Sequence, residues 1–210
     1  VIGKACHKAA ERFYRGSKIP NAIKHGFNLI KETPDFEIDY GKTGSRDKMI
    51  ERYYQTVDIF FDCIPLKPGK IIGVEQVAVQ PVITDPEYTP KENANVAFEI
   101  PAKTYSDLVF LDGRKRLVIW DYKFSWQFKD PESIYHDLFV QAMFNYHTNW
   151  QLHKKRPYKI VFWLVKGSEN RDESRPQLIP VEIVFKKNPK FFTLFYYLYF
   201  ECTDEIMKPD

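Results

Sequence analysis

Two apolar runs separated by a short turn constrain the fold of this chain more than any other feature. They span residues 106–110 and 117–125, and Asp112 followed by Gly113 gives the signal of a tight turn between them. We therefore expect a β-hairpin. Three charged side chains interrupt the two expected strands: Asp107, Asp121 and Lys123. Burying a charge is costly unless a metal or an opposite charge compensates it, so these positions need an explanation.

The alternation of side chains along a strand places Asp121 and Lys123 on one face, while Trp120 and Tyr122 point to the other. The turn can also bring Asp107 near Asp121. Two carboxylates that lie this close stay ionised only if a cation lies between them, and Mg²⁺ or Mn²⁺ fits such oxygen ligands. The alternative is a structural ion pair between Asp121 and Lys123, because an Asp-x-Lys triplet often occurs by accident.

The first residues of the chain predict an amphipathic helix over residues 1–15. Its expected core face consists of Ile2, Cys6, Ala9, Ala10 and Phe13. His7, Glu11 and Tyr14 form a neighbouring stripe along the same helix. A histidine in such a stripe is either an ordinary helix residue or, next to paired aspartates, a metal ligand.

These features occur in a characteristic order: a Gly-x-x-x-His helix, a strand with Asp107, a second strand with Asp-Tyr-Lys-x-Ser at 121–125, and a helix with Gln141. The combination resembles the RecB-type exonuclease branch of the PD-(D/E)XK nuclease superfamily, which includes CRISPR-associated and recombination exonucleases. The resemblance runs from Gly3 to about Val165. It implies an α/β fold with a restriction-endonuclease-like core, in which helices flank a central mixed β-sheet.

The resemblance also implies residue roles. It assigns the metal, Mg²⁺ or Mn²⁺, to three side chains and one backbone carbonyl: His7, Asp107, Asp121 and Tyr122. Lys123 would position the attacking water, and Ser125 matches the small hydroxyl residue that commonly follows the lysine of the family. Glu11 either orients His7 by binding its second ring nitrogen or is a solvated helix glutamate.

Three further positions are weaker candidates for substrate contacts or support. Glu75 resembles a glutamate in the preceding strand of relatives, although an edge-strand carboxylate in water is the alternative. Gln141 matches the glutamine that contacts the DNA backbone or braces the lysine. Relatives place a tyrosine four residues later, where this chain has Asn145, and Tyr146 lies about 100° further around the helix. Both Gln141 and Tyr146 could instead pack against the sheet.

Charge alone does not identify a nucleic-acid partner, because the formal net charge is only +3. Basic residues do gather at 153–156 and in the group Arg46, Lys48 and Arg52. Such clusters can follow a phosphate backbone, and Trp126 or Tyr135 could stack on unpaired bases. Ordinary solvated helix faces look the same. DNA, single- or double-stranded, is therefore the partner implied by the resemblance rather than by the composition.

Cysteine usage limits both the compartment and the cofactors. The three cysteines are widely scattered, so we expect a reduced, cytoplasmic environment. Some members of the resembling family bind an iron-sulfur cluster through four cysteines, and this chain cannot supply four. The apolar runs are too short to span a bilayer, so no membrane partner is expected.

The organisation of the chain favours a single α/β nuclease domain over residues 1–210. The start without Met inside a helical pattern also suggests that the chain is part of a longer protein. Residues 84–95, rich in polar residues and proline, are expected to form an exposed hairpin tip. The aromatic helix that includes residues 191–200 needs cover from the sheet, a second subunit or a missing flanking segment.

Together with these patterns, the resemblance implies a divalent-metal-dependent deoxyribonuclease, an enzyme that hydrolyses DNA phosphodiester bonds with a metal-activated water, most simply as an exonuclease. Two alternatives stay open. One is a nuclease-like domain that acts in nucleic-acid binding or assembly without catalysis. The other is a structure-specific or sequence-specific endonuclease of the same fold, which would cleave closed circular DNA.

Overall fold

The computed structural model describes residues 1–41, 44–125, 131–168 and 177–207, the side chains of 131–137 excepted. Its α-helices are α1 (Ile2–Tyr14), α2 (Ile19–Glu32), α3 (Arg46–Cys63), α4 (Pro131–His153) and α5 (Pro189–Met207). Its strands are β1 (Lys70–Ile83), β2 (Ala97–Leu111), β3 (Leu117–Ser125), β4 (Pro157–Lys166) and β5 (Leu178–Val184).

The strands form one five-stranded mixed sheet in the order β1-β2-β3-β4-β5. All neighbouring pairs are antiparallel except β3 and β4, which run parallel and are joined by α4. The predicted hairpin is present: Leu108 pairs with Trp120, and Asp112 accepts hydrogen bonds from the backbone N–H groups of Arg114 and Arg116 at the turn. The chain therefore has an α/β fold with helices on both faces of the sheet.

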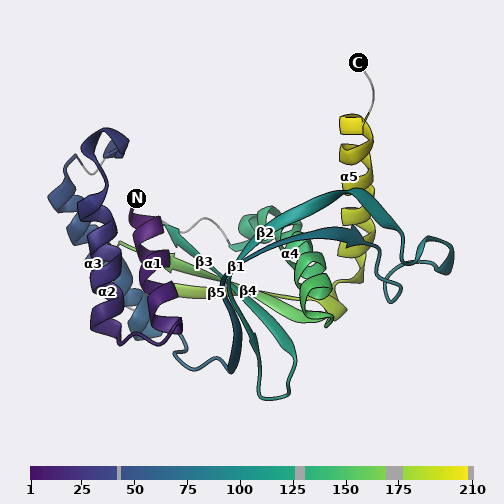
Figure 1. Ribbon diagram of the computed structural model, residues 1–210, viewed down its shortest axis with the longest axis horizontal. Coiled ribbons are helices and arrows are strands. Elements are labelled where there is room, and N and C mark those ends of the chain that lie inside the picture. Colours follow the sequence, from purple (N-terminus) through teal and green to yellow (C-terminus); the bar gives the residue numbers. More distant parts are fainter. Residues whose placement is uncertain (42–43, 126–130, 169–176, 208–210) are drawn as a thin grey trace.

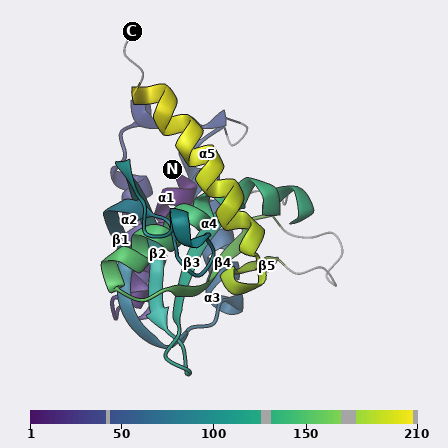
Figure 2. The ribbon, with the colours of Figure 1, turned by 90° about the vertical axis from the view of Figure 1, so that its right-hand side faces the viewer.

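Two hydrophobic clusters lie on opposite sides of this sheet. Helices α1 to α3 form one cluster with the inner residues Leu108, Trp120 and Tyr122. Helices α4 and α5 form the other cluster with residues such as Ile119 and Phe162. Figure 1 shows α1 to α3 grouped at one end of the molecule and α4 with α5 toward the other, and Figure 2 shows α5 running across the face that carries α4.

In the sequence, Ser45 predicts the start of an amphipathic helix because serine is a favourable capping residue. The α3 helix begins there, and the Ser45 hydroxyl accepts a hydrogen bond from the Lys48 N–H. Its buried face differs from the expected one. The sequence predicts that Ile50, Tyr53, Tyr54, Val57 and Phe61 form the buried side, but Tyr54 is 39% exposed, whereas Phe60 is fully buried. The reason is that α3 packs against α1, α2 and the sheet at once, which shifts its apolar stripe.

The β1–β2 hairpin changes the side on which it packs halfway along its length. Leu108 and Phe110 belong to the cluster of α1 to α3. Ser106, however, donates to the Asn145 side chain of α4 at 2.7 Å, and Thr104 bonds with Thr148 of the same helix. The β2–β3 ladder also stops at Leu108, so the distal hairpin leaves β3 and extends toward α5 (Figure 1). Asp107 lies at this switch.

Glu75 lies opposite Asp107, because Val74 pairs with Leu108 and Gln76 pairs with Ser106. Its φ angle is +49°, in the left-handed region. This conformation costs a residue with a side chain about 1–2 kcal/mol. Such strain persists only where surrounding contacts impose it, and here the two packed halves of the hairpin do so.

The connection between β1 and β2 is exposed over most of residues 84–95, as expected, but its first two residues are buried. Asp85 is completely buried, and Thr84 is 5% exposed. Arg156 and Tyr146 of the α4 region bond to the Asp85 carboxylate and hold the start of the connection against the protein.

The α5 helix covers the second cluster with only one of its faces. Six large apolar side chains of this helix stay exposed: Leu194, Tyr197, Leu198, Phe200, Ile206 and Met207. The expectation that this helix contacts a second subunit or a flanking segment stays a prediction. Within the part of the chain that the structure describes, no helix combines the length and apolar character that crossing a membrane requires.

Candidate active site

Three side chains from three separate elements meet at the switch of the hairpin. His7 comes from α1, Glu75 from β1 and Asp107 from β2. The His7 Nδ1 atom lies 3.1 Å from Asp107 Oδ1 and 3.8 Å from Glu75 Oε1. One potential ligand atom from each residue lies within 4.8 Å of the other two, a spacing that a single metal ion can bridge.

The second oxygen of Asp107 has a backbone partner. The Tyr122 N–H of β3 donates to Asp107 Oδ2 at 2.5 Å. Because β2 and β3 no longer pair beyond Leu108 and Trp120, this carboxylate takes the place of a ladder hydrogen bond. The fork between the two strands thus fixes Asp107 and leaves its other oxygen directed at His7.

Asp121 of β3 is bound by two partners of its own. Lys123 Nζ lies 2.6 Å from Asp121 Oδ1, and the Gln141 side-chain amide of α4 donates to Asp121 Oδ2 at 2.7 Å. The Asp121 side chain is only 6% exposed, whereas that of Lys123 is 36% exposed. Asp121 is therefore held in place, and Lys123 can still reach a ligand.

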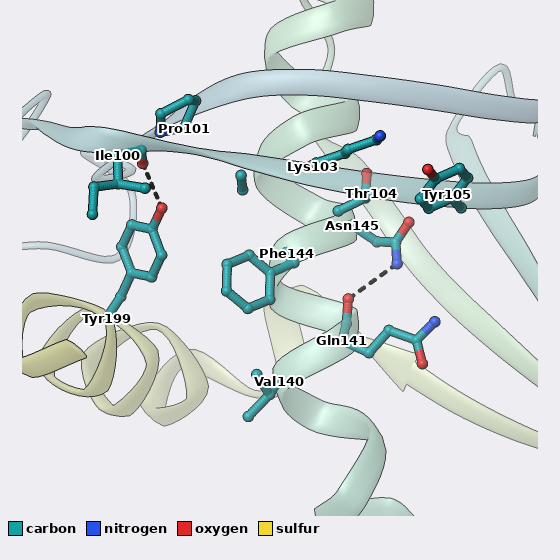
Figure 3. A pocket seen from close by; sticks show the side chains of 11 residues that line it. Ile100, Pro101, Lys103, Thr104, Tyr105, Val140, Gln141, Phe144, Asn145 and Tyr199 are labelled. Atoms are coloured by element: carbon teal, nitrogen blue, oxygen red, sulfur yellow. Dashed lines mark hydrogen bonds between the residues drawn. The ribbon is translucent and has the colours of Figure 1, made fainter. Parts of the chain in front are cut away.

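A cavity of about 650 Å³ adjoins Gln141 between β2, α4 and α5. Figure 3 shows Gln141 and Phe144 of α4 below the β2 strand, with Tyr199 of α5 at the other end. The Asn145 side chain donates to the Gln141 carbonyl, and the Tyr199 hydroxyl donates to the Ile100 carbonyl. The cavity thus lies next to the residue that positions Asp121.

Electrostatics in this region disfavour the ionised carboxylates. Burial, followed by repulsion from Asp107, raises the pKa of Asp121 to about 6, although Lys123 and His7 oppose the shift. Burial and the charge of Asp107 likewise raise the pKa of Glu75 to about 7 against the influence of His7. Negative charge is therefore only partly compensated by the protein.

The pKa of His7 is also affected by this excess of negative charge. Burial by itself would lower the pKa of His7. The hydrogen bond and charge of Asp107, with the charges of Glu75 and Asp121, outweigh burial and raise the pKa of His7 above its ordinary value. A positive charge is thus stabilised at this point, whether it is a proton or a metal ion.

The structure brings most of the predicted residues together but changes their grouping. His7 and Asp107 are in contact, and Asp121 and Lys123 share a strand face as expected. Asp121 is not part of the group that can share one ion among the described residues; Glu75 takes that place. Glu75 is also not the solvated edge carboxylate of the alternative interpretation, since its side chain is 33% exposed and faces His7.

Two weaker candidates lie elsewhere. Tyr146 is buried and donates to Asp85 at 2.6 Å, which corrects the expectation that it contacts substrate beside Gln141. Glu11 forms ion pairs with Lys8 and Arg15, so it does not orient His7. Tyr146 is bound by a carboxylate that is distant in the sequence. Glu11 is bound by cations about one helical turn away on the same helix.

The remaining predicted residues surround the site without joining the cluster. The Tyr122 ring packs toward α1, where it stacks on Tyr14, so only its backbone faces Asp107. Ser125 is exposed at the end of β3. The stacking candidates Trp126 and Tyr135 lie outside the residues, or the side chains, that the structure describes.

The donor set suits a divalent metal that accepts nitrogen as well as oxygen. Carboxylates alone would suit Mg²⁺, whereas the imidazole of His7 favours Mn²⁺ or another transition metal. The uncompensated carboxylates add an electrostatic preference for a cation. The residues present therefore fit the group that the resemblance implies, with Mn²⁺ ahead of Mg²⁺.

Comparison with known proteins adds no assignment: no protein-family model matches this chain, and no curated protein matches it significantly. A functional interpretation must therefore start from the geometry of these side chains. That geometry combines a possible metal-binding group with a buried carboxylate and an accessible ammonium group, which together can act on a phosphate ester.

Proposed function

We propose that this protein is a divalent-metal-dependent nuclease of the RecB-type PD-(D/E)XK family that hydrolyses phosphodiester bonds in DNA, acting as an exonuclease. One observation carries the proposal. The group of His7, Glu75 and Asp107 lies at the strand fork whose other arm presents Asp121 and Lys123. A structural role alone would not require carboxylates with raised pKa values at this point.

Each residue has a role in the proposed reaction. His7, Glu75 and Asp107 would hold the metal, and Asp121 would join them when Lys123 turns toward substrate. A divalent ion bound there would lower the pKa of a water molecule and neutralise charge on the phosphate. The Lys123 ammonium would donate to a phosphate oxygen or to the attacking water. Gln141 would keep Asp121 oriented toward the ligand side.

The order of elements supports the family proposal. An antiparallel hairpin, β2–β3, is followed by α4 and by a parallel strand, β4. This is the arrangement that a restriction-endonuclease-like core requires, with the paired acidic residues on the hairpin. The cavity beside Gln141 adds room for a nucleotide. Tyr105 and Phe144 line it with aromatic rings and Lys103 with a positive charge, the side chains that contact bases and phosphates.

The alternative is a nuclease-like domain that binds nucleic acid without cleaving it. The observation in its favour is the close ion pair between Asp121 and Lys123, which by itself is a sufficient structural reason for both residues. Calorimetry separates the two functions. An active site takes up Mn²⁺ with a dissociation constant of roughly millimolar or below and loses that uptake on Asp107→Ala.

The direct test uses end-labelled single-stranded and double-stranded DNA with Mn²⁺ or Mg²⁺. We expect a ladder of products from one end with the wild-type protein and none with Lys123→Ala. Lys159→Ala is a matched control, because Lys159 pairs with Glu182 at 2.6 Å on the same sheet. If the wild-type protein leaves all substrates intact, the nuclease proposal is wrong. Cleavage of closed circular DNA would instead indicate the endonuclease alternative.

A further inference from the structure

A second pocket, of about 380 Å³, lies at the opposite end of β3 from Lys123 and is strongly basic. Six cationic side chains line it: Arg114, Lys115, Arg116, Lys155, Arg156 and Lys186. Pro157 and three tyrosines complete the lining: Tyr88, Tyr146 and Tyr158. Its charge and its aromatic surface distinguish it from the acidic cluster around Asp107.

The fold, rather than the local sequence, gathers these cations. Arg114, Lys115 and Arg116 belong to the β2–β3 turn, and the register that pairs Leu117 with Pro157 brings this turn next to the start of β4. Lys186 follows β5, which pairs with β4. Three segments separated by about 30 to 40 residues therefore contribute positive charge to one site.

Only some of these charges are compensated. Arg116 pairs with Asp112 at 2.7 Å, and Arg156 pairs with Asp85 at 2.7 Å. Glu87 adds a more distant contact to Arg156 at 3.8 Å. Among the described residues, no carboxylate forms an ion pair with the other four cations: Arg114, Lys115, Lys155 and Lys186. Cations that line one pocket without a carboxylate partner repel, so the pocket favours an anion.

The geometry suits phosphate groups on a flexible chain. The Arg116 guanidinium lies 3.7 Å from the centre of the Tyr158 ring, which holds its planar donors in a fixed orientation. The neighbouring Lys154 and Lys187 are also exposed and extend the basic surface beyond the pocket. More cations are present than one small anion can contact, so a polyanion fits better than a free phosphate.

The distance between the basic pocket and the candidate active site is short enough for one nucleic acid to contact both. Along β3, Leu117 and Lys123 are separated by six residues, or roughly 20 Å at about 3.3 Å per residue. This length corresponds to about six base-pair steps of a duplex. A nucleic acid that is cleaved near Asp107 could therefore reach the basic pocket with a more distant phosphate.

We propose that this basic pocket binds the phosphate backbone of the nucleic acid at a distance from the metal. The choice of ligand rests on the proposed nuclease function, whereas the anion preference follows from the pocket itself. Binding here would hold the substrate in register while the terminal nucleotide lies near Gln141 and Asp107. The contact would be independent of base sequence and sensitive to salt.

The test compares two triple variants of the full chain that lose the same charge. The pocket variant is Arg114→Gln, Lys115→Gln and Lys186→Gln. The control is Lys18→Gln, Lys24→Gln and Lys67→Gln, three exposed lysines in the layer of α1 to α3. Binding of a labelled 30-base-pair duplex is measured in EDTA over a range of NaCl concentrations, so that cleavage plays no part.

We expect the pocket variant to bind at least about tenfold more weakly at low salt. We also expect the slope of log affinity against log salt to be smaller by about 2.7, since each of the three lost phosphate contacts contributes about 0.9. The control should change both quantities far less. Equal losses in the two variants would overturn the proposal. Lys186→Glu alone provides a second test, with a smaller loss in the same direction, if the triple variant does not fold.

A competition arm identifies the source of the phosphate. Inorganic pyrophosphate at low millimolar concentration should displace the duplex only weakly, because it occupies few of the cations. Tight pyrophosphate binding that leaves duplex affinity unchanged would indicate a small-anion site and overturn the proposal. If the duplex binds through this pocket but Mn²⁺ gives no cleavage, the nuclease proposal fails while the inference about the pocket stands.

Discussion

Two carboxylate sites in this protein, Asp85 and the strand fork, differ in how their charge is compensated. Asp85 accepts hydrogen bonds from Arg156 Nε and Nη2 at 2.7 and 2.8 Å and from the Tyr146 hydroxyl at 2.6 Å. Although burial opposes it, these partners lower the pKa of Asp85. At the strand fork the opposite holds, since the pKa values of Glu75 and Asp121 are raised.

The comparison separates a structural carboxylate from candidate functional ones. Asp85 has every charge partner supplied by the protein, and it ties the β1–β2 connection to α4. The carboxylates around His7 share one imidazole and one ammonium group, so they keep an unmet need for positive charge. Removing a carboxylate from one site or the other should therefore have opposite effects. Loss of Asp85 should lower stability and leave metal binding intact, whereas loss of Asp107 should abolish metal binding and change stability little.

The largest effect is expected for Asp107→Asn. Loss of this carboxylate removes a proposed metal ligand and the partner of His7, so the rate of DNA cleavage should fall by about 10³-fold, as for other groups that stabilise charge in a transition state. Mn²⁺ uptake measured by calorimetry should disappear. Thermal unfolding should change little, because the substitution also removes repulsion. Wild-type activity in this variant would exclude Asp107 from the site.

Asp85→Asn is expected to do the reverse. The substitution leaves Arg156 facing a neutral side chain, and the free energy of unfolding should fall by about 3 kcal/mol, the lower end of the range for a broken buried pair because Arg156 is 41% exposed. Urea denaturation measures this loss. Mn²⁺ uptake by the folded variant should match that of the wild type; a loss of uptake would mean that the two groups are coupled.

The pH dependence of stability without metal should also separate the groups. Folded Glu75 and Asp121 bind protons up to pH values of about 7 and 6, above the ordinary carboxylate range. The folded state therefore holds more protons than the unfolded state between about pH 4.5 and 7. Stability from these groups is present at low pH and is lost as the pH rises through that window. Asp85 has the opposite sign, since its lowered pKa stabilises the fold above the ordinary carboxylate range.

We expect the melting temperature of the metal-free wild type to fall by about 2–4 °C between pH 5 and 7.5, which corresponds to roughly 1 kcal/mol for a chain of this length. The Glu75→Gln and Asp121→Asn double variant should show a flatter profile. Mn²⁺ should offset the fall at high pH, because metal and protons compete for the same carboxylates. Identical profiles in the two proteins would contradict the raised pKa values.

The smallest effect is expected for Gln141→Leu. Gln141 touches Asp121 rather than the proposed substrate, so it acts as a positioning residue. Loss of its hydrogen bond should weaken Mn²⁺ affinity or activity by about tenfold, at the lower end for residues that orient a metal ligand. Calorimetry over a pH series measures the effect, and the midpoint of uptake should move. A change in stability alone would make Gln141 a structural residue.

Local sequence patterns predicted the elements of the fold well. The Ser45 cap, the Asp112–Gly113 turn and the period-two pattern over 117–125 each depend on neighbouring residues, and the structure contains all three as expected. The pairing of Asp121 with Lys123 is likewise a consequence of strand periodicity. These signals are short-range, so they can be read from the chain directly.

The composition of the site was harder to predict, because it depends on contacts between distant residues. Glu75 was a weak candidate, and no pattern in 70–83 signals its left-handed backbone or its position opposite Asp107. Tyr146 was assigned to the wrong place, since its partner Asp85 lies 61 residues away. The basic residues at 153–156 also do not act as one cluster, because His153 bonds to Gln76 and Arg156 bonds to Asp85.

The sequence by itself determined the hairpin, its acidic residues and the helices on either side, because periodicity, caps and turn residues act over a few positions. Only the tertiary structure decided that the hairpin switches packing sides at Asp107, that Glu75 joins His7 there, and that cations from three segments meet at the far end of β3. The physical reason is that strand register and helix packing set these distances, and both depend on the whole sheet rather than on any one segment.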